Sequence, residues 1–210
     1  EWLARTNKEH SNWLSALEHA IKTNIEAGLF ISGGFAAFPE DNHEHRRWLA
    51  EFLQKPESKE YPYARAKALY RQGGILIGFE QYDEAYAAAE ESLALFRAVG
   101  DPYGEIDNLV SLGWIFGYRD APAKRAEVLE QALTLARTLG DAARQAHVLS
   151  VLGWAHRDFT RTFSYWEQAI TLYRQIGQWA GLANVLSNMG YFLLMDNQID
   201  VAEEYLNEAN

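Results

Sequence analysis

"SLGWIF" at residues 111–116 and "VLGWAH" at residues 151–156 are two versions of one phrase, a Leu-Gly-Trp inside an apolar run. A glycine inside a helix costs about 1 kcal/mol relative to alanine, so its repetition indicates a structural use. Aligning the chain with itself matches four glycines at steps of 40, 40 and 37 residues, namely Gly73, Gly113, Gly153 and Gly190. Such a spacing is the period of a repeat array.

A second phrase recurs in step with these glycines. It reads "LALFRAVGD" at 93–101, "LTLARTLGD" at 133–141 and, more loosely, "ITLYRQIGQ" at 170–178. Each version predicts a helix end with a left-handed glycine cap, followed in two of them by an aspartate that can cap the next helix. The glycines are Gly100, Gly140 and Gly177, and the aspartates are Asp101 and Asp141. Each period therefore predicts two amphipathic helices.

The pattern predicts an all-α fold, a stack of antiparallel helix hairpins. No stretch shows sustained strand-like alternation, and the prolines fall in expected loops or helix starts. We expect helices near residues 8–23, 25–38, 43–54, 62–79, 82–98, 102–117, 122–138, 142–157, 161–176, 179–194 and 198–209.

The composition excludes several function classes. The 210 residues are 48% apolar, enough for a large core, and include no cysteine for a disulfide, a thiol nucleophile or a thiolate metal site. A formal charge of −10 argues against nucleic-acid binding by this segment. Neither a membrane span nor a secretory leader is visible, so we expect a cytoplasmic protein. Because the first residue is Glu1 and not Met, we expect a piece of a longer chain.

Two stretches resemble the tetratricopeptide repeat. They are "GGILIGFEQYDEAYAAAEESL" at 73–93 and "GYFLLMDNQIDVAEEYLNEA" at 190–209. The family places a small residue in the first helix and alanines in the second, which here are Gly73 with Ala85, and Gly190 with Ala202 and Ala209. The resemblance implies a right-handed superhelical solenoid, in which the glycine lets the backbone of the second helix approach closely.

The match has three departures. The repeats run to 37–40 residues against the usual 34, Arg125 stands where the second-helix alanine belongs, and the hairpin after Gly153 is about three residues shorter. We divide the chain into an N-terminal helical cap or linker with a first degenerate hairpin, residues 1–60, and repeats at about 61–100, 101–140, 141–177 and 178–210. The last helix keeps apolar side chains on its outer face, so further repeats are expected beyond residue 210.

The N-terminal stretch carries a different resemblance. Trp2-Leu3, "EHSNW" at 9–13, Ala16-Leu17 and "RRWL" at 46–49 resemble the segment that precedes long tetratricopeptide-like repeats in bacterial signal-transduction ATPases with numerous domains, the STAND or NB-ARC type of transcriptional regulator. The resemblance implies that a nucleotide-switch domain lies upstream. No phosphate-binding loop ending in Gly-Lys-Ser or Gly-Lys-Thr occurs in these 210 residues, so we expect no cofactor in this segment.

The residue after each repeat glycine is the candidate binding position. These positions hold Phe35, Gly74, Trp114, Trp154 and Tyr191. By the family resemblance they face a concave groove, where aromatic side chains supply contact area at low entropic cost. The neighbouring groove positions are polar, namely Asp107, Ser111, His147, Ser150, Arg157, Asn184, Ser187 and Asn188. The alternative is that the aromatic rings simply pack between neighbouring first helices.

Catalytic and metal signals are weak. Asn42-His43-Glu44-His45 offers two imidazoles, but residues two apart do not share a helix face, and a solvated helix start is the preferred interpretation. The paired acids Glu90-Glu91 and Glu203-Glu204 fall on polar helix faces. We therefore expect neither a catalytic nor a metal site.

The residue patterns predict a non-catalytic binding domain, and the N-terminal resemblance implies that it acts as the sensor or regulatory arm of a larger STAND-type ATPase. A protein, a peptide or a small-molecule effector would bind in the groove and release an intramolecular contact with the upstream switch domain. A constitutive interaction or oligomerisation scaffold is the alternative, and an enzyme built on a solenoid is a third class that lacks a convergent acid/base cluster.

Overall fold

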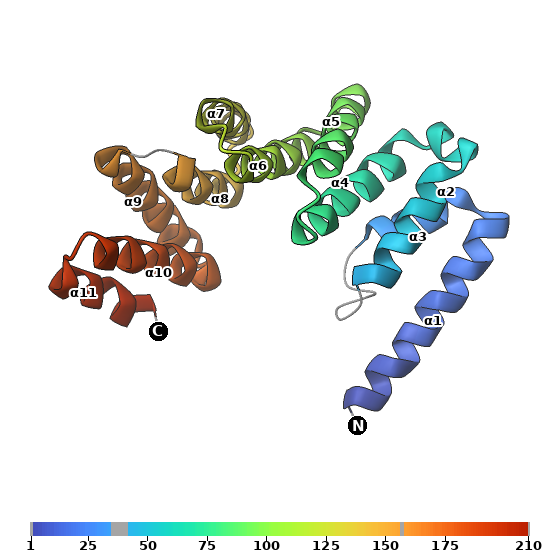
Figure 1. Cartoon of the computed structure of the whole chain (residues 1–210), viewed down its shortest axis with the longest axis horizontal. Coiled ribbons are helices and arrows are strands. Elements are labelled where there is room, and N and C mark those ends of the chain that lie inside the picture. Colours follow the sequence, from blue (N-terminus) through green and yellow to red (C-terminus); the bar gives the residue numbers. More distant parts are fainter. Residues whose placement is uncertain (1, 35–41, 156–157, 210) are drawn as a thin grey trace. The chain divides into compact units, whose positions relative to one another are not determined.

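The computed structural model describes residues 2–34, 42–155 and 158–209, and this part of the chain contains helices and turns but no strand (Figure 1). The all-α prediction is confirmed. The helices are α1 Trp2–Thr23, α2 Ile25–Gly33, α3 Asn42–Gln54, α4 Pro62–Gly78, α5 Tyr82–Val99, α6 Pro102–Tyr118, α7 Pro122–Thr138, α8 Ala142–Leu152, α9 Phe159–Ile176, α10 Trp179–Met195 and α11 Ile199–Ala209, with 3-10 turns η1 Pro56–Glu60 and η2 Gly153–Ala155. Within the described residues, no helix has both the length and the apolar content that a membrane crossing needs.

Two helices are shorter than predicted. The helix expected over 25–38 ends at Gly33, and the one expected over 142–157 ends at Leu152 and tightens into η2. The second difference accompanies the shorter hairpin, because α9 begins at Phe159, where the Asp158 side chain accepts a hydrogen bond from the Thr160 N–H at 2.9 Å. The chain must therefore leave the first helix earlier than it does in the other repeats.

The turns between successive hairpins follow the predicted glycine caps. Gly100, Gly140 and Gly177 have φ of +72°, +67° and +69°, the left-handed conformation that a side chain disfavours. The Asp101 carboxylate accepts hydrogen bonds from two N–H groups at the start of α6, and Asp141 accepts one from the Arg144 N–H at 2.9 Å. This backbone bond is the main cause that lowers the pKa of Asp141. Both aspartate caps are confirmed.

The turns inside three hairpins use a device that the sequence analysis missed. Glu80, Asp120 and Asn197 occupy equivalent positions and have φ of +58°, +49° and +60°. In each turn the following residue donates its N–H to a carbonyl five residues earlier, at 2.9 Å. A left-handed residue and this hydrogen bond reverse the chain within a few residues, so the two helices of each hairpin run antiparallel.

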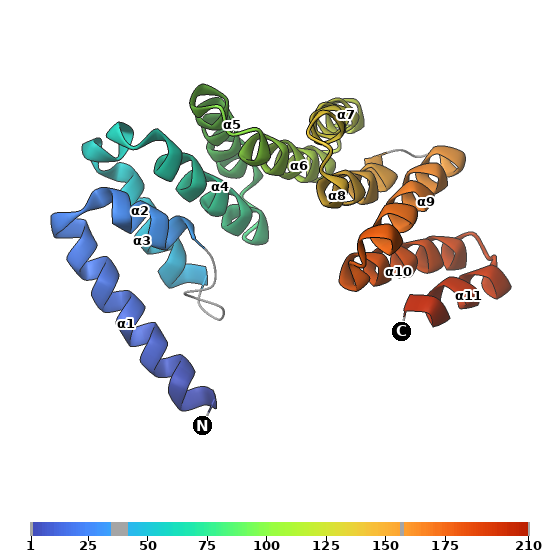
Figure 2. The same cartoon turned by 180° about the vertical axis from the view of Figure 1, so that it is seen from behind.

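The helices group into two compact units, Glu1–Ser111 and Leu112–Asn210, with the boundary inside α6. In the first unit, α2 and α3 pack on α4 around Leu29, Leu49 and Phe52, and α4 packs on α5. In the second unit, α7 to α11 pack in chain order, each on the next (Figure 2). The expected division into a cap or linker segment, residues 1–60, and repeats from residue 61 onward depends on which hairpins are true repeats, and it stays a prediction.

The repeat glycines have different neighbours. A Cβ on Gly73 would meet the Ala85 carbonyl oxygen at 3.6 Å, whereas one on Gly190 would lie 2.6 Å from the Leu206 side chain and 3.2 Å from the Ala202 carbonyl oxygen. On Gly113 it would lie 2.7 Å from Leu129, and on Gly153 only 2.0 Å from the indole nitrogen of Trp166. The interpretation that glycine admits the second-helix backbone is therefore wrong at Gly113 and Gly153, where a large side chain fills the space.

Candidate functional site

Three aromatic residues follow the repeat glycines of the second unit. Trp114 in α6 is 36% exposed and Tyr191 in α10 is 58% exposed. Trp154 in η2 is half-buried, and its ring contacts that of Trp166 edge-on, with 5.2 Å between centroids. Trp114 and Tyr191 thus present their rings to solvent. Phe35, proposed for the same series, lies outside the described residues, and Gly74 adds no ring.

Trp154 packs because the second helix of its hairpin carries an aromatic core. Trp166 in α9 is 0% exposed, and its indole N–H donates to the Ser150 carbonyl at 3.0 Å. Phe163 and Phe192 place their rings 6.1 Å and 5.6 Å from that of Trp166. Trp154 therefore packs against the second helix of its own hairpin, whereas the packing alternative places these rings between neighbouring first helices.

The polar candidates of α10 share one face of that helix. Asn184 and Ser187 are exposed, Asn188 is half-buried, and the Asn188 amide donates to Asn184 Oδ1 at 3.2 Å. With Tyr191 they follow the three- and four-residue spacing that puts side chains side by side. An aromatic ring flanked by amides and a hydroxyl is a surface that can hold a polar ligand.

The remaining polar candidates differ in accessibility. His147 in α8 is exposed, whereas Ser150 is buried and its hydroxyl donates to the His147 carbonyl at 2.7 Å. Asp107 and Ser111 are half-buried in the part of α6 that belongs to the first unit. Arg157 lies outside the described residues.

Arg125, which the sequence analysis treated only as a departure from the repeat pattern, lies against the first of these rings. The Arg125 guanidinium stands over the Trp114 ring at 5.4 Å from its centroid. It also covers Gly117, because a Cβ there would be 2.9 Å from Arg125 Nη1. The sequence feature that could have predicted this contact is the long side chain at position 125 together with a glycine at position 117.

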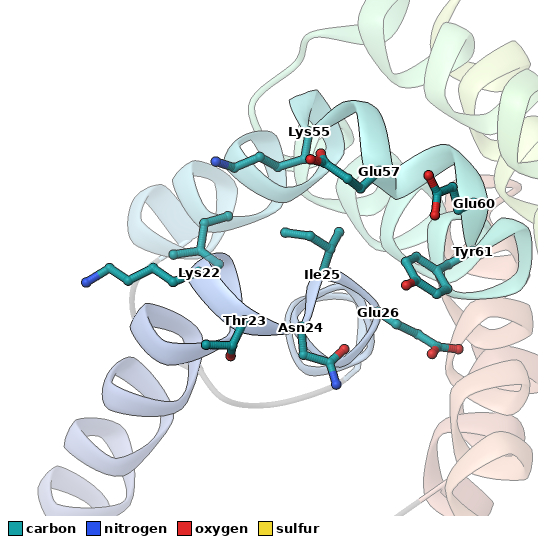
Figure 3. Close-up of a pocket in the computed structure, with 10 residues that line it drawn as sticks. Lys22, Thr23, Asn24, Ile25, Glu26, Lys55, Glu57, Glu60 and Tyr61 are labelled. Atoms are coloured by element: carbon teal, nitrogen blue, oxygen red, sulfur yellow. The ribbon is translucent and has the colours of Figure 1, made fainter.

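A hollow of about 440 Å³ lies in the first unit, where α1 turns into α2 beside η1 (Figure 3). Figure 3 shows Ile25 in its centre, Lys22 and Lys55 on one side, and Glu26, Glu60 and Tyr61 on the other. The Asn24 side chain caps α2 by accepting from the Ala27 N–H at 2.9 Å. Charges of both signs border this mostly polar hollow, and no feature of it favours one ligand class.

Two further hollows lie in the second unit. One of about 430 Å³ is bordered by α7, α8 and α9, and one of about 340 Å³ by α9 and α11. Their linings are dominated by the second helices of the hairpins, including Glu167 and Thr171, which border both. None of the described groove candidates lines any of these three hollows. The described candidates therefore lie on the first helices or in η2, outside these three hollows.

The residues considered for chemistry have structural neighbours. His45 is 1% exposed, and its Nε2 lies 2.6 Å from the Ser32 carbonyl oxygen, so the expected solvated helix start is wrong for this residue. Burial is the main cause that lowers the pKa of His45. Across the described residues, no three His, Asp or Glu side chains gather as a metal would require. Glu90, Glu91, Glu203 and Glu204 are exposed, as predicted for polar helix faces.

Comparisons with known proteins assign neither a family nor a function to this chain. No protein-family model matches the chain, and a search of curated proteins finds no significant relative.

Proposed function

We propose that this chain is a non-catalytic binding domain, built as a right-handed tetratricopeptide-like solenoid, whose first helices recognise a protein, a peptide or a small-molecule effector. The observation that carries the proposal is the pair of exposed rings, Trp114 and Tyr191, at equivalent repeat positions of the second unit. Large exposed aromatic residues with polar neighbours are the side chains that anchor ligands most strongly.

The proposal extends to a regulatory arm of a cytoplasmic STAND-type ATPase or transcriptional regulator. It is supported by the repeat pattern and the N-terminal motifs. The arm holds a nucleotide-switch domain of the same polypeptide at rest and releases it when ligand binds, which requires that the ligand prefer one of the two states. A constitutive interaction scaffold is the second candidate, and a full-length gene without a nucleotide-switch domain would favour it.

Native mass spectrometry of the chain recovered from an extract of its own organism tests the binding role. We expect a bound mass on the unchanged chain that disappears in Trp114→Ser/Tyr191→Ser, with a loss of at least about 2 kcal/mol of binding free energy. The matched control is Ile176→Ser, because Ile176 is similarly exposed, at 37%, but lies on the second helix α9.

Three outcomes separate the alternatives. A mass lost only in the aromatic double variant supports the first-helix face. A mass retained in both variants places the ligand elsewhere and contradicts the proposal. A chain that carries no ligand in any preparation, yet associates with itself or with a constant partner, favours the scaffold.

A further inference from the structure

The α6–α7 hairpin holds a positive charge that has no carboxylate partner. The Nε of Arg125 is buried and makes no hydrogen bond, and none of the ion pairs within the described residues includes Arg125. Removing a cation from water without a counter-charge is costly, and a stacked ring recovers only part of that cost. Burial accordingly lowers the pKa of Arg125, an effect that the nearby Tyr118 opposes.

Arg65 in α4 shows what a satisfied buried arginine looks like in this chain. Its guanidinium donates to Glu91 at 2.7 Å, to the Leu53 carbonyl at 2.9 Å and to the Ser58 hydroxyl at 2.6 Å. Arg65 therefore has its donors occupied by the protein itself. Arg125 has the ring of Trp114 on its face and no equivalent set of acceptors.

The surroundings of Arg125 favour an anionic ligand. Lys124 lies next to it, with its ammonium 5.7 Å from the Phe116 ring centroid, and Tyr118 is 54% exposed. The guanidinium fits against α6 because position 117 is glycine, where the equivalent residues of two other repeats are Ile77 and Leu194. Two cations, a phenol and an open indole thus gather at one end of a hairpin in a chain whose formal charge is −10.

We infer that Arg125 and Trp114 form a binding site for a carboxylate carried near a planar apolar group. Stacking uses the face of a guanidinium, and its terminal N–H groups can then bind a carboxylate through two parallel hydrogen bonds. The exposed part of the Trp114 ring covers the planar group. The inference rests on the proposed function, since Trp114 belongs to the same face, and it specifies the chemistry of the ligand.

An NMR titration of the whole chain near neutral pH tests the site, with the Nε–H signals of the arginines and the indole signal of Trp114 as readouts. The probes are benzoate, a free aromatic acid, and N-acetyl-phenylalanine, which imitates the end of a peptide. We expect saturable shifts at Arg125 and Trp114, and binding about tenfold weaker or lost in Arg125→Gln. Whichever probe binds more tightly identifies the source of the carboxylate.

The controls lie within the same spectrum and the same probe set. Arg65 should not respond, because its donors are occupied, and Arg161, whose side chain is 67% exposed, should respond without saturation. Benzamide, which lacks the charge, should leave Arg125 unmoved. Inorganic phosphate that binds as tightly as benzoate, or an Arg125 signal that moves no more than that of Arg161, overturns the inference. The titration of the unchanged chain decides the question even if Arg125→Gln does not fold.

The outcome for the carboxylate site can be distinguished from the outcome for the proposed binding role. A natural ligand that is lost in Trp114→Ser/Tyr191→Ser but kept in folded Arg125→Gln preserves the binding role and removes the carboxylate site. A saturable benzoate shift on a chain that carries no natural ligand supports the carboxylate site and leaves the binding role without its expected ligand.

Discussion

The interface between α5 and α6 contains a hydrogen-bonded polar pair, whereas the equivalent positions of the α7–α8 and α9–α10 interfaces hold apolar residues. The Ser92 hydroxyl accepts from the Asn108 amide at 2.5 Å and donates to the Ala66 carbonyl at 2.8 Å. One and two periods later, the same two positions hold Ala132 with Val148 and Ala169 with Val185. All six side chains are 0% exposed.

The comparison shows that these repeats change their packing in pairs. A Cβ on Gly104 would lie 2.3 Å from the Phe96 ring, and one on Gly181 would lie 2.5 Å from the Tyr173 ring. One period after Phe96 and Gly104, the equivalent positions hold the small Ala136 and the long Arg144. Close packing requires that bulk on one helix be matched by space on the next.

The largest expected effect breaks such a pair at the aromatic interface. Gly153→Ala should destabilise the chain by about 3 kcal/mol, because the new Cβ would meet the Trp166 indole, which the rings of Trp154, Phe163 and Phe192 and a hydrogen bond hold in place. Urea denaturation followed by circular dichroism measures the change. Gly153→Ala combined with Trp166→Leu should cost less than the sum of the two single changes. Additive costs would show that the indole is not the obstacle.

The next effect tests the polar interface. Ser92→Ala should cost about 2 kcal/mol, because it leaves the buried Asn108 amide without its acceptor. The double change Ser92→Ala/Asn108→Val copies the pairs found one and two periods later and should recover most of that loss. The free energy of unfolding of both variants is the measurement. A double variant less stable than Ser92→Ala would contradict the idea that the pair is exchangeable as a unit.

A pH effect should separate the two units, because the first contains the buried imidazole of His45. Burial, opposed by the hydrogen bond to Ser32 and assisted by Arg71, lowers the pKa of His45 from 6.5. Below pH 6.5 the unfolded chain takes up a proton that the folded chain resists. Stability from this group is therefore complete above that pH and falls as the pH decreases toward the folded pKa.

Urea denaturation at a series of pH values between neutral and mildly acidic checks this dependence. His45→Gln, which keeps a hydrogen-bond donor near Ser32, should remove it. An unchanged pH profile in that variant would assign the dependence to other groups.

The smallest effect has the opposite sign. Gly73→Ala should stabilise the chain by up to about 1 kcal/mol, because within the described residues the new Cβ would have one neighbour inside 4 Å, the Ala85 carbonyl oxygen at 3.6 Å, which is an ordinary contact. The shift of the thermal midpoint is the measurement. A loss of stability would show that the backbones of α4 and α5 approach too closely for a methyl group.

Much of the fold was predictable because its determinants are local. Helix positions follow from apolar spacing of three and four residues, and the caps at Gly100, Gly140 and Gly177 follow from conformations that need no distant partner. The candidate site was less predictable. The exposure of Trp114 and the half-burial of Trp154 come from one motif, and they differ because Trp166 stands opposite only the second.

The sequence by itself determined an all-helical chain of regular hairpins and the position of every turn between successive hairpins, since hydrogen bonds and capping act within a few residues. Only the tertiary structure decided what each repeat glycine accommodates, that Arg125 lies over Trp114 without a carboxylate, and that His45 is buried beneath Ser32. Those features depend on side chains from different helices competing for the same space, and equivalent repeat positions meet different competitors.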